Sequence, residues 1–331
     1  MKFGLFGGAR AARGGPAGDS QGYADYIDYV CEAEALGFHS VFVVEHHFTG
    51  HGQVSASLNI LSYLAARTSR IRLGTAVVVL PWHNSVLVAE QAATLDLLSN
   101  GRFDFGVGKG YRDAEFAGFC VPPAEATERF DEAMAVIRKA WSGSERFSHR
   151  GKRWHYDNIV VEPAPKQRPH PPFWLGAGSD ESIRRAAREG YNLLLDQLAP
   201  IELIVGRVAA FHAECARIGR PYDPLQIGVT RGFQLLSDES ERTAAIATRF
   251  EVLKAIGGLA RGAGAEAYRT IGGQAGEKEL DDAALLGTAD QIVARLRKLQ
   301  AGGVELVLLV DPRPSRDNLR RFAREIMPAF A

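Results

Sequence analysis

The sequence predicts an α/β protein in which residues 1–331 form a single (β/α)8 TIM barrel domain. Strand-like and helix-like patterns alternate along the chain, and eight strand-like segments are almost continuously apolar, as buried parallel strands are. No internal repeat or domain linker separates them. An open doubly wound sheet is the main alternative, but Gly7 and Gly8 end the first strand without the GxGxxG fingerprint of that fold.

Each predicted element follows from the spacing of its apolar residues. Short apolar runs predict strands at residues 2–6, 39–44, 71–79, 102–107, 173–176, 192–196, 226–236 and 304–310. Apolar residues spaced three and four apart predict helices at residues 23–36, 54–66, 86–98, 129–141, 183–188, 201–218, 289–300 and 316–326. Eight such strands separated by helices are expected to close into a barrel.

Three segments depart from this alternation. Aromatic and charged residues alternate around a Gly-Lys turn and predict a hairpin at residues 147–161, inserted after the fourth barrel helix. Five prolines within residues 163–172 predict an extended connector. The glycine- and alanine-rich residues 257–287 predict a long loop after strand 7, which is either a lid over the barrel mouth or a poorly ordered excursion.

Composition and charge narrow the kinds of partner. The 39 basic residues balance 39 acidic residues, so nothing indicates binding to nucleic acid or to a membrane surface, and a small near-neutral substrate is expected. Cys31, Cys120 and Cys215 have no CxxC spacing, which favours a reducing compartment. The N-terminus lacks the apolar core of a signal peptide, and no segment approaches the roughly 20 apolar residues of a membrane span. We therefore expect a cytoplasmic protein.

Ionisable residues follow the second predicted strand. Glu45, His46 and His47 stand at its carboxyl end, where the loops of a barrel converge on its site. A histidine at this place titrates near neutral pH and can serve as a general acid or base. On the residues alone, a structural or solvent-exposed pair of histidines is an alternative interpretation.

A metal site is another interpretation of this segment. His47 and His51 are four residues apart, and Glu45 lies nearby. However, Gly50 and Gly52 interrupt the helix that would align the two histidines, and the first strand carries no HxH pair of the kind found in metal-dependent barrel hydrolases. We therefore predict no metal site.

Two further segments have the composition of phosphate-binding loops. In Gly-Val-Gly-Lys-Gly-Tyr at residues 106–111, the glycines allow close approach of a ligand and Lys109 supplies a positive charge. Gly178, Ser179 and Ser182 lie at the start of a predicted helix, where free N–H groups and hydroxyls can bind a phosphate. Ser179 is equally typical of a helix N-cap, and the two roles are compatible.

Three motifs carry a resemblance to a known family. They are Glu-His-His-Phe at residues 45–48, Gly-Thr-Ala-Val-Val-Val-Leu-Pro at residues 74–81 and Gly-Arg-Phe-Asp-Phe-Gly-Val-Gly-Lys-Gly-Tyr at residues 101–111. Together they resemble the bacterial luciferase family of flavin-dependent monooxygenases. The similarity also includes Met-Lys-Phe-Gly at residues 1–4 and Glu-Ala-Leu-Gly-Phe at residues 34–38, so it covers nearly the whole chain.

The resemblance implies an activity and a catalytic group. A barrel of this family binds reduced FMN at its mouth as a co-substrate and uses it with O2 to oxygenate a small organic substrate, such as an aldehyde or another apolar compound. By the same resemblance, His46 handles protons, while Glu45 and His47 shape its surroundings.

The resemblance also assigns the cofactor-binding residues. A cis peptide bond between Ala76 and Val77 is expected to support the flavin ring, and Lys109 is expected to contact the flavin phosphate. Gly108 stands where the luciferase α-chain has a reactive cysteine, so thiol chemistry is not expected there. The other residues assigned to cofactor binding are Gly108, Tyr111, Gly178, Ser179 and Ser182.

Partners are implied by family analogy. Since the chain shows no separate nucleotide-binding domain, an NAD(P)H:flavin reductase is expected to supply the reduced FMN. A homodimer that packs through the helices at residues 54–66 and 86–98 is also expected. Aromatic and apolar residues that can line a substrate pocket are Phe48, Trp82, Tyr111, Phe116, Trp154 and Phe233.

Three other functions remain open at this stage. Relatives with the same fold bind a deazaflavin and transfer hydride without O2, although the motifs at residues 45–48 and 74–81 resemble the FMN branch more. A flavin-binding protein without catalysis is a second alternative, and the retention of His46, Lys109 and Ser179 speaks against it. A metal-dependent barrel hydrolase is the third. The resemblance does not imply light emission.

Overall fold

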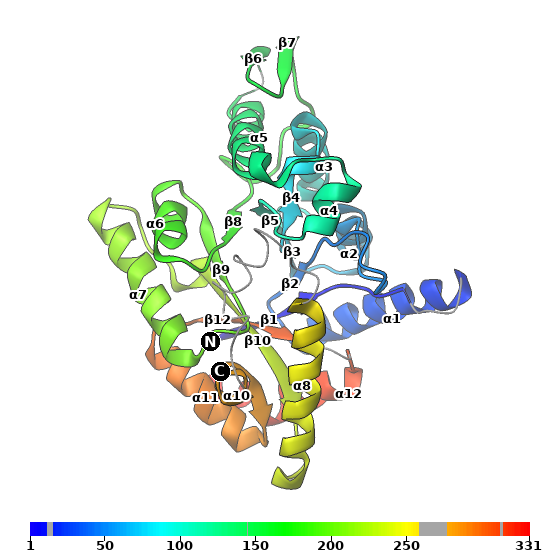
Figure 1. Cartoon of the computed structure of the whole chain (residues 1–331), viewed down its shortest axis with the longest axis vertical. Coiled ribbons are helices and arrows are strands. Elements are labelled where there is room, and N and C mark those ends of the chain that lie inside the picture. The colour runs from blue at the N-terminus through cyan, green and yellow to red at the C-terminus, as the bar shows by residue number, and fades with distance from the viewer. Residues whose placement is uncertain (12–15, 144, 258–276, 312–313) are drawn as a thin grey trace.

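The structure is a computed structural model that describes residues 1–11, 16–143, 145–257, 277–311 and 314–331. Eight parallel strands close a barrel in the order β1-β2-β3-β5-β8-β9-β10-β12, and β12 pairs with β1. Figure 1 shows helices arranged around this ring of strands. The TIM barrel predicted from the sequence is confirmed.

The first half of the barrel runs from β1 to α5. Its strands are β1 (Lys2–Gly7), β2 (Ser40–Val43), β3 (Arg72–Thr75), β4 (Val78–Val79) and β5 (Phe103–Gly108). Its helices are α1 (Pro16–Ala35), α2 (Ser57–Arg67), α3 (Ser85–Leu98), α4 (Asp113–Gly118) and α5 (Ala126–Trp141). The Asn84 side chain accepts hydrogen bonds from the backbone N–H groups of Val86 and Leu87, and this cap fixes the start of α3.

The second half contains a strand that extends beyond the barrel rim. Its strands are β8 (Phe173–Gly176), β9 (Asn192–Leu195), β10 (Ile227–Leu235), β11 (Leu285–Gly287) and β12 (Leu306–Val310). Its helices are α6 (Asp180–Arg188), α7 (Ile201–Arg217), α8 (Arg242–Gly257), α10 (Glu277–Ala283), α11 (Ala289–Ala301) and α12 (Arg316–Glu325). The first residues of β10 pair with β9, its middle pairs with β12, and its last residues pair with β11.

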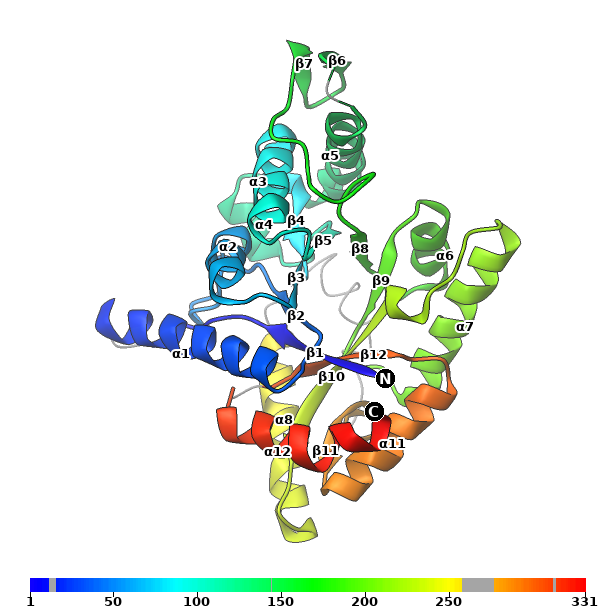
Figure 2. The same cartoon turned by 180° about the vertical axis from the view of Figure 1, so that it is seen from behind.

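The hairpin predicted at residues 147–161 is confirmed. Strands β6 (Phe147–Arg150) and β7 (His155–Ile159) pair antiparallel, and both views show them projecting beyond α5, away from the barrel (Figures 1 and 2). The connector that follows contains neither helix nor strand between β7 and β8, and cis peptide bonds precede Pro163 and Pro169. Proline supplies no backbone N–H, so this stretch cannot enter a sheet interior.

The predicted long loop after strand 7 is wrong in part. Within the predicted residues 257–287, α10 and β11 occupy residues 277–283 and 285–287, whereas residues 258–276 lie outside the described part of the chain. Helix α8, at residues 242–257 before this segment, was not predicted. Apolar residues of α8 pack against β11 and the end of β10, and Arg242 pairs with Asp281 at 2.7 Å. These contacts join residues far apart in sequence, so a local apolar pattern does not reveal them.

The segment from residue 71 to residue 118 also differs from the prediction. The single strand expected at residues 71–79 is divided into β3 and β4, and the peptide bond between Ala76 and Val77, which lies between them, is cis. Helix α4 was not predicted, since its six residues are too few to show a helical period.

The core has two layers. Inside the barrel, Phe42, Trp174, Leu194, Leu306 and Leu308 form a buried cluster. A larger cluster lies between the strands and the surrounding helices, with Phe3 and Phe322 packed edge to face at a ring distance of 5.1 Å. Alternate residues of each strand therefore serve the two layers, as expected for a barrel.

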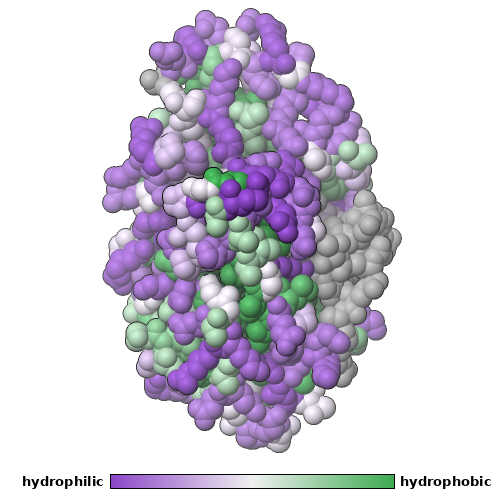
Figure 3. Space-filling view, turned by 90° about the vertical axis from the view of Figure 1, so that its left-hand side faces the viewer, coloured by the Kyte–Doolittle hydropathy of each residue, from purple (hydrophilic) through white to green (hydrophobic). Residues whose placement is uncertain are grey.

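The chain ends lie side by side. The amino group of Met1 donates to the carbonyl oxygen of Phe330 at 3.3 Å, and the labels N and C are adjacent in Figures 1 and 2. Figure 3 shows one face of the molecule, where hydrophilic side chains predominate around a central band of apolar ones. No helix in the described ranges is both long and apolar enough to span a bilayer.

Close packing between β3 and β5 gives a first testable prediction. A Cβ atom on Gly106 would lie 1.7 Å from the carbonyl oxygen of Thr75, which belongs to the neighbouring backbone. We expect Gly106→Ala to lower the free energy of unfolding by at least about 2 kcal/mol in urea titrations, because the strands must move apart. Gly176→Ala is the control, since a Cβ there meets nothing within 4 Å, and its effect is expected to stay within about 0.5 kcal/mol. Equal effects of the two substitutions would contradict this packing argument.

Candidate active site

The buried carboxylate of Glu45 organises the C-terminal end of β2. Its side chain is 3% exposed. The Oε1 atom lies 3.1 Å from His47 Nε2, 2.8 Å from His83 Nε2 and 2.9 Å from Trp82 Nε1, which donates to it. The Oε2 atom accepts from the backbone N–H of Val79 at 3.4 Å. One carboxylate therefore ties the end of β2 to the segment that follows β4.

These contacts determine the charge of Glu45. Burial alone would raise its pKa, but the hydrogen bonds from His47, His83 and Trp82, together with the charge of His83, outweigh it and hold the pKa of Glu45 at about 2. The side chain is therefore ionised across the physiological pH range.

His46 is held by a different carboxylate. Its Nδ1 atom lies 3.1 Å from Oε1 of Glu115, and the same oxygen accepts from the backbone N–H of His47 at 2.9 Å. Arg112 lies 3.7 Å from this oxygen. Since a carboxylate paired with an arginine only accepts hydrogen bonds, the proton of the His46 ring resides on Nδ1 and Nε2 keeps its lone pair.

The surroundings of His46 favour its neutral form. Burial lowers the pKa of His46, the hydrogen bond to Glu115 acts in the opposite direction, and the nearby charge of Arg112 adds to the lowering. The net direction is below the ordinary value, so His46 is neutral at neutral pH. A neutral imidazole with a free Nε2 can accept a proton from a ligand.

An aromatic cluster covers the outer side of this group. The rings of Trp82 and Phe119 stack at 5.2 Å, and Phe116 meets Trp82 edge to face at the same distance. His47 packs its ring against Phe119 at 4.7 Å, and Phe48, 61% exposed, lies beside both. Trp82, Phe116 and Phe48 were expected near a substrate, whereas Trp154 belongs to the projecting hairpin, where it stacks on Tyr156.

The residues assigned to the flavin ring lie at the ends of β4 and β5. The peptide bond between Ala76 and Val77 is cis, which confirms that geometric expectation. Val79 pairs with Gly108, and a Cβ atom on Gly108 would lie 2.4 Å from Cγ2 of Val77. A residue with a side chain at position 108 would therefore displace the Val77 side chain from the strand end.

The residues assigned to the flavin phosphate follow β5 and β8, which are neighbours in the barrel. Val107 pairs with Leu175, so Lys109 and the loop after Gly176 leave adjacent strand ends. Lys109 is exposed, and its Nζ donates to Oγ1 of Thr127 at 3.3 Å.

Both roles considered for the serines are compatible with the start of α6. Ser179 Oγ accepts from the backbone N–H of Ser182 at 3.3 Å, and Ser182 Oγ accepts from that of Ser179 at 3.1 Å, which is a capping box. Gly178 precedes the cap. The first-turn residues Asp180 and Glu181 match the helix dipole.

The donor set fits a phosphate-bearing cofactor. An exposed ammonium and the amino end of a nine-residue helix follow adjacent strands, and the ammonium and the first N–H groups of the helix can donate to phosphate oxygens. The two serine hydroxyls donate within the cap, from Ser179 to Ser182 at 2.9 Å and from Ser182 to the carbonyl oxygen of Ser179 at 2.8 Å. Above Gly176 there is open space, since a Cβ there meets nothing within 4 Å. Lys109, Gly178, Ser179 and Ser182 would hold the phosphate of a flavin, and Ala76, Val77 and Gly108 would lie beside its ring.

Tyr111 connects the two sides of the barrel mouth. Its ring meets His46 edge to face at 6.4 Å, and the guanidinium of Arg112 lies 5.5 Å from its centre. On its other side, Tyr111 packs against the buried cluster of Leu198, Leu253 and Leu280. This ring therefore separates His46 from α8 and α10.

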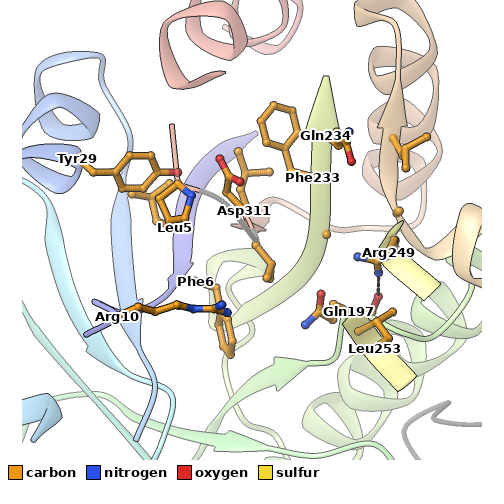
Figure 4. A pocket seen from close by; sticks show the side chains of 18 of the residues that line it. Leu5, Phe6, Arg10, Tyr29, Gln197, Phe233, Gln234, Arg249, Leu253 and Asp311 are labelled. Atoms are coloured by element: carbon orange, nitrogen blue, oxygen red, sulfur yellow. Dashed lines mark hydrogen bonds between the residues drawn. The ribbon is translucent and has the colours of Figure 1, made fainter. Parts of the chain in front are cut away.

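A cavity of about 320 Å³ opens at the carboxyl ends of β1, β10 and β12. Figure 4 shows that α1 and α8 supply its flanking walls. Phe233 lines it, as expected for a substrate pocket, but none of the residues assigned to catalysis or to the cofactor is among its described lining residues.

Sequence reasoning missed Arg112, Glu115 and His83, although they complete the two carboxylate networks. Their signal was weak, because none of the three stands at the end of a predicted strand: Arg112 follows the glycine-rich loop, Glu115 lies in the short helix α4, and His83 follows Trp82. Within the described ranges, no three His, Cys, Asp or Glu side chains are grouped in a way that could hold a metal ion.

Comparison with known proteins identifies the family of the chain. The family model of luciferase-like monooxygenases matches residues 1–306. The chain belongs to this family, and the resemblance found in its motifs is confirmed.

Two curated relatives illustrate the range of the family. The chain is 30% identical over 184 residues to the oxygenase component of a flavin-dependent trigonelline monooxygenase from Acinetobacter baylyi, covering 55% of this chain and 49% of the relative. It is 27% identical over 296 residues to an FMNH(2)-dependent dimethylsulfone monooxygenase from Pseudomonas putida, covering 83% and 79%. The chain spans about half the length of the first curated relatives it matches.

Solved structures share the fold. The monooxygenase RslO1 from Streptomyces bottropensis superposes with a TM-score of 0.84 at 24% identity, with both chains covered completely. An F420-dependent secondary alcohol dehydrogenase superposes with a TM-score of 0.80 at 17% identity, covering 100% of this chain and 99% of that one. At these identities the likeness establishes the barrel alone.

The ionised Glu45 gives a second prediction. Its folded-state pKa lies below the unfolded value, so its contribution to stability is fully present above about pH 4.5 and is lost as the pH falls towards 2. We expect Glu45→Gln to be about 3 kcal/mol less stable than the wild type at pH 7, and the difference to shrink by more than half at pH 2.5. Urea unfolding at both pH values measures it, and a deficit independent of pH would refute the assigned charge.

Proposed function

We propose that the protein is the oxygenase of a two-component FMN-dependent monooxygenase that acts on a small organic substrate. The observation that carries the proposal is that a half-buried His46 held by Glu115, Lys109 and the amino end of α6 all follow the carboxyl ends of barrel strands. Membership of the luciferase-like family and the FMNH(2)-dependent relative support the choice of flavin.

The reaction balances with reduced FMN and O2. When bound, reduced FMN supplies two electrons, so that one oxygen atom enters the substrate and the other leaves as water. Lys109, Gly178, Ser179 and Ser182 bind the phosphate, and Ala76, Val77 and Gly108 position the ring. The protein's own chemical contribution is then proton handling and exclusion of water.

His46 performs the proton handling. Its Nδ1–H is fixed on Glu115, so Nε2 is the atom that accepts a proton and later returns it. The aromatic cluster of Trp82, Phe116 and Phe119 limits access of water from the outer side. Glu45 and His47 act on His46 by fixing the backbone that carries it, and neither needs to touch the substrate.

Partners follow from the same proposal. Reduced FMN must be delivered by an NAD(P)H:flavin reductase, which fits the description of the trigonelline relative as an oxygenase component. A homodimer would cover the exposed apolar side chains of α2 and α3, namely Tyr63, Leu87, Leu97 and Leu98. The three cysteines without CxxC spacing agree with a reducing, cytoplasmic location.

Hydride transfer to a deazaflavin is the second candidate. The F420-dependent dehydrogenase has the same barrel, and the donor set would accept the phosphate of either cofactor. The motifs that resemble the FMN branch favour the oxygenase. A flavin binder without catalysis would have no need of the network that holds His46 neutral.

Anaerobic titration with reduced FMN and with reduced F420 tests the choice of cofactor. We expect tighter binding of reduced FMN, measured by quenching of tryptophan fluorescence, and O2-dependent product formation. Lys109→Gln should weaken the binding of reduced FMN about tenfold by removing a charged contact with the phosphate. Lys298→Gln is the control, because this exposed residue lies at the opposite end of the barrel, near the carboxyl end of α11. Preference for F420 without consumption of O2 would overturn the monooxygenase.

Substitution of His46 tests its role. His46→Ala should lower the product yield per reduced FMN at least about a hundredfold, measured with the first compound that the wild type oxygenates in a substrate screen. The dissociation constant for reduced FMN should change less than about threefold, because His46 does not contact the phosphate site. His155→Ala, in the projecting hairpin, is the matched control. Unchanged product yield in His46→Ala would remove this residue from the mechanism.

A further inference from the structure

The cavity at the ends of β1, β10 and β12 has the size and the walls of a small-molecule site. Its volume of about 320 Å³ lies at the lower end of the range of about 300–1,000 Å³ for such sites. Most of its wall is apolar, formed by Leu5, Phe6, Phe233, Leu253, Leu286 and Leu309. A compact and largely apolar ligand fits this space.

Arg249 lines this cavity, and its guanidinium occupies space that is available because residue 232 is a glycine. A Cβ atom on Gly232 would lie 1.8 Å from Nη1 and 2.5 Å from Cζ of Arg249. The absence of a side chain on β10 therefore lets Arg249 reach from α8 across the strand end. Its Nη2 donates to the carbonyl oxygen of Gln197 at 3.0 Å, which fixes the plane of the group (Figure 4).

Arg10 brings a second positive charge to the cavity. It follows β1, its side chain is exposed, and Figure 4 shows it reaching in from the side opposite Arg249 and ending beside Phe6. Tyr26 adds a donor, since its buried hydroxyl in the cavity wall has no hydrogen-bond partner in the described part of the chain, and the residue is only 5% exposed. Donors therefore converge here from the loop after β1, from α1 and from α8.

One acidic residue, Asp311, also lines the cavity. Figure 4 places it near Tyr29 and Leu5, away from Arg249, and it accepts from the backbone N–H of Ser315 at 3.3 Å. The cavity thus carries two guanidinium groups, on opposite sides, and one carboxylate. Guanidinium groups bind carboxylates with paired hydrogen bonds.

Two contacts join the cavity to His46. The backbone N–H of Val44, two residues before His46, donates to the carbonyl oxygen of Gly7 at 2.8 Å, and Gly7 lines the cavity at the end of β1. On the other side, Leu253 lines the cavity and packs in the cluster that receives Tyr111, whose ring meets His46. The cavity is therefore linked to His46 through Val44 on one side and through Tyr111 on the other.

We propose that this cavity binds the organic substrate and that the substrate is an apolar compound with a carboxylate, held by Arg10 and Arg249. The proposal rests on the proposed monooxygenase function. It refines the near-neutral substrate expected from the net charge, because the local charge of the cavity differs from the charge of the whole chain.

A matched pair of probes tests the charge preference. We would titrate the full chain, without flavin, with 1-naphthaleneacetate and with the uncharged 1-naphthaleneacetamide, and measure binding by calorimetry. The carboxylate should bind at least about tenfold more tightly than the amide. Arg249→Gln should reduce this preference about tenfold or more, and Arg10→Gln, at an exposed position, about threefold.

Three further variants control for folding and position. Gly232→Ala keeps Arg249 but pushes its guanidinium off the strand end, so it should weaken the carboxylate probe and leave the amide unchanged. Arg249→Lys should restore part of the preference, because it keeps the charge without the planar fork. Lys254→Gln removes an exposed charge from the same helix and should have no effect.

The outcomes separate this proposal from the proposed function. Equal affinities for the two probes, or a preference that survives in both Arg249→Gln and Gly232→Ala, would overturn the carboxylate site even if reduced FMN binds. Failure to bind reduced FMN, together with an intact carboxylate preference, would overturn the monooxygenase and the substrate role of the cavity. Binding of reduced FMN, together with a carboxylate preference that Arg249→Gln and Gly232→Ala abolish, supports both.

Discussion

The buried carboxylate of Glu45 is the interaction on which the site depends. It gathers donors from His47, Trp82, His83 and the backbone of Val79, so one ionised group fixes the end of β2 against the segment after β4. A buried charge is tolerated only when it is surrounded by donors, and each donor here comes from the rim of the barrel. His46 follows Glu45 directly, so the contacts of Glu45 also fix the position of His46. From this position the His46 ring contacts Glu115.

The barrel mouth is divided into two halves by this arrangement. One half, from β4 to α6, carries small residues, an ammonium and a helix amino end, and it suits a cofactor with a phosphate. The other half, at β10, β12 and β1, carries the cavity. His46 and Tyr111 lie between them, so proton transfer, cofactor and ligand are kept on separate elements of a rigid ring.

The features that the sequence predicted were those set by local pattern or by family motif. Apolar runs located the eight barrel strands, and position at a strand end pointed to His46 and Lys109. The cis bond at Ala76 followed from the resemblance, since nothing in a run of small and branched residues signals it. Helix α8 was not predicted. Its buried side chains pack against β11, and β11 has only three residues, too few to show a periodic pattern.

The partners of His46 and the cavity were not predictable for a related reason. Glu115 lies 69 positions after His46, and only closure of the barrel brings the two together. Arg249 can occupy its position only because Gly232 has no side chain. The two residues lie on different elements, so the sequence pattern of neither element predicts this contact. The net charge of the whole chain is zero and gives no indication that two arginines, Arg10 and Arg249, line one small cavity.

The pairing of β1 with β12 has a consequence for synthesis of the chain. Lys2 to Leu5 stand in register with Leu306 to Leu309, so one of the two neighbours of β1 is made long after β1 itself. During translation, the edge of β1 that pairs with β12 stays unpaired until residues 306–310 have left the ribosome. The ring of strands cannot close before then. Pairing between residues so far apart in sequence makes ring closure a late event in folding, and until then one edge of β1 is open to pairing with other chains.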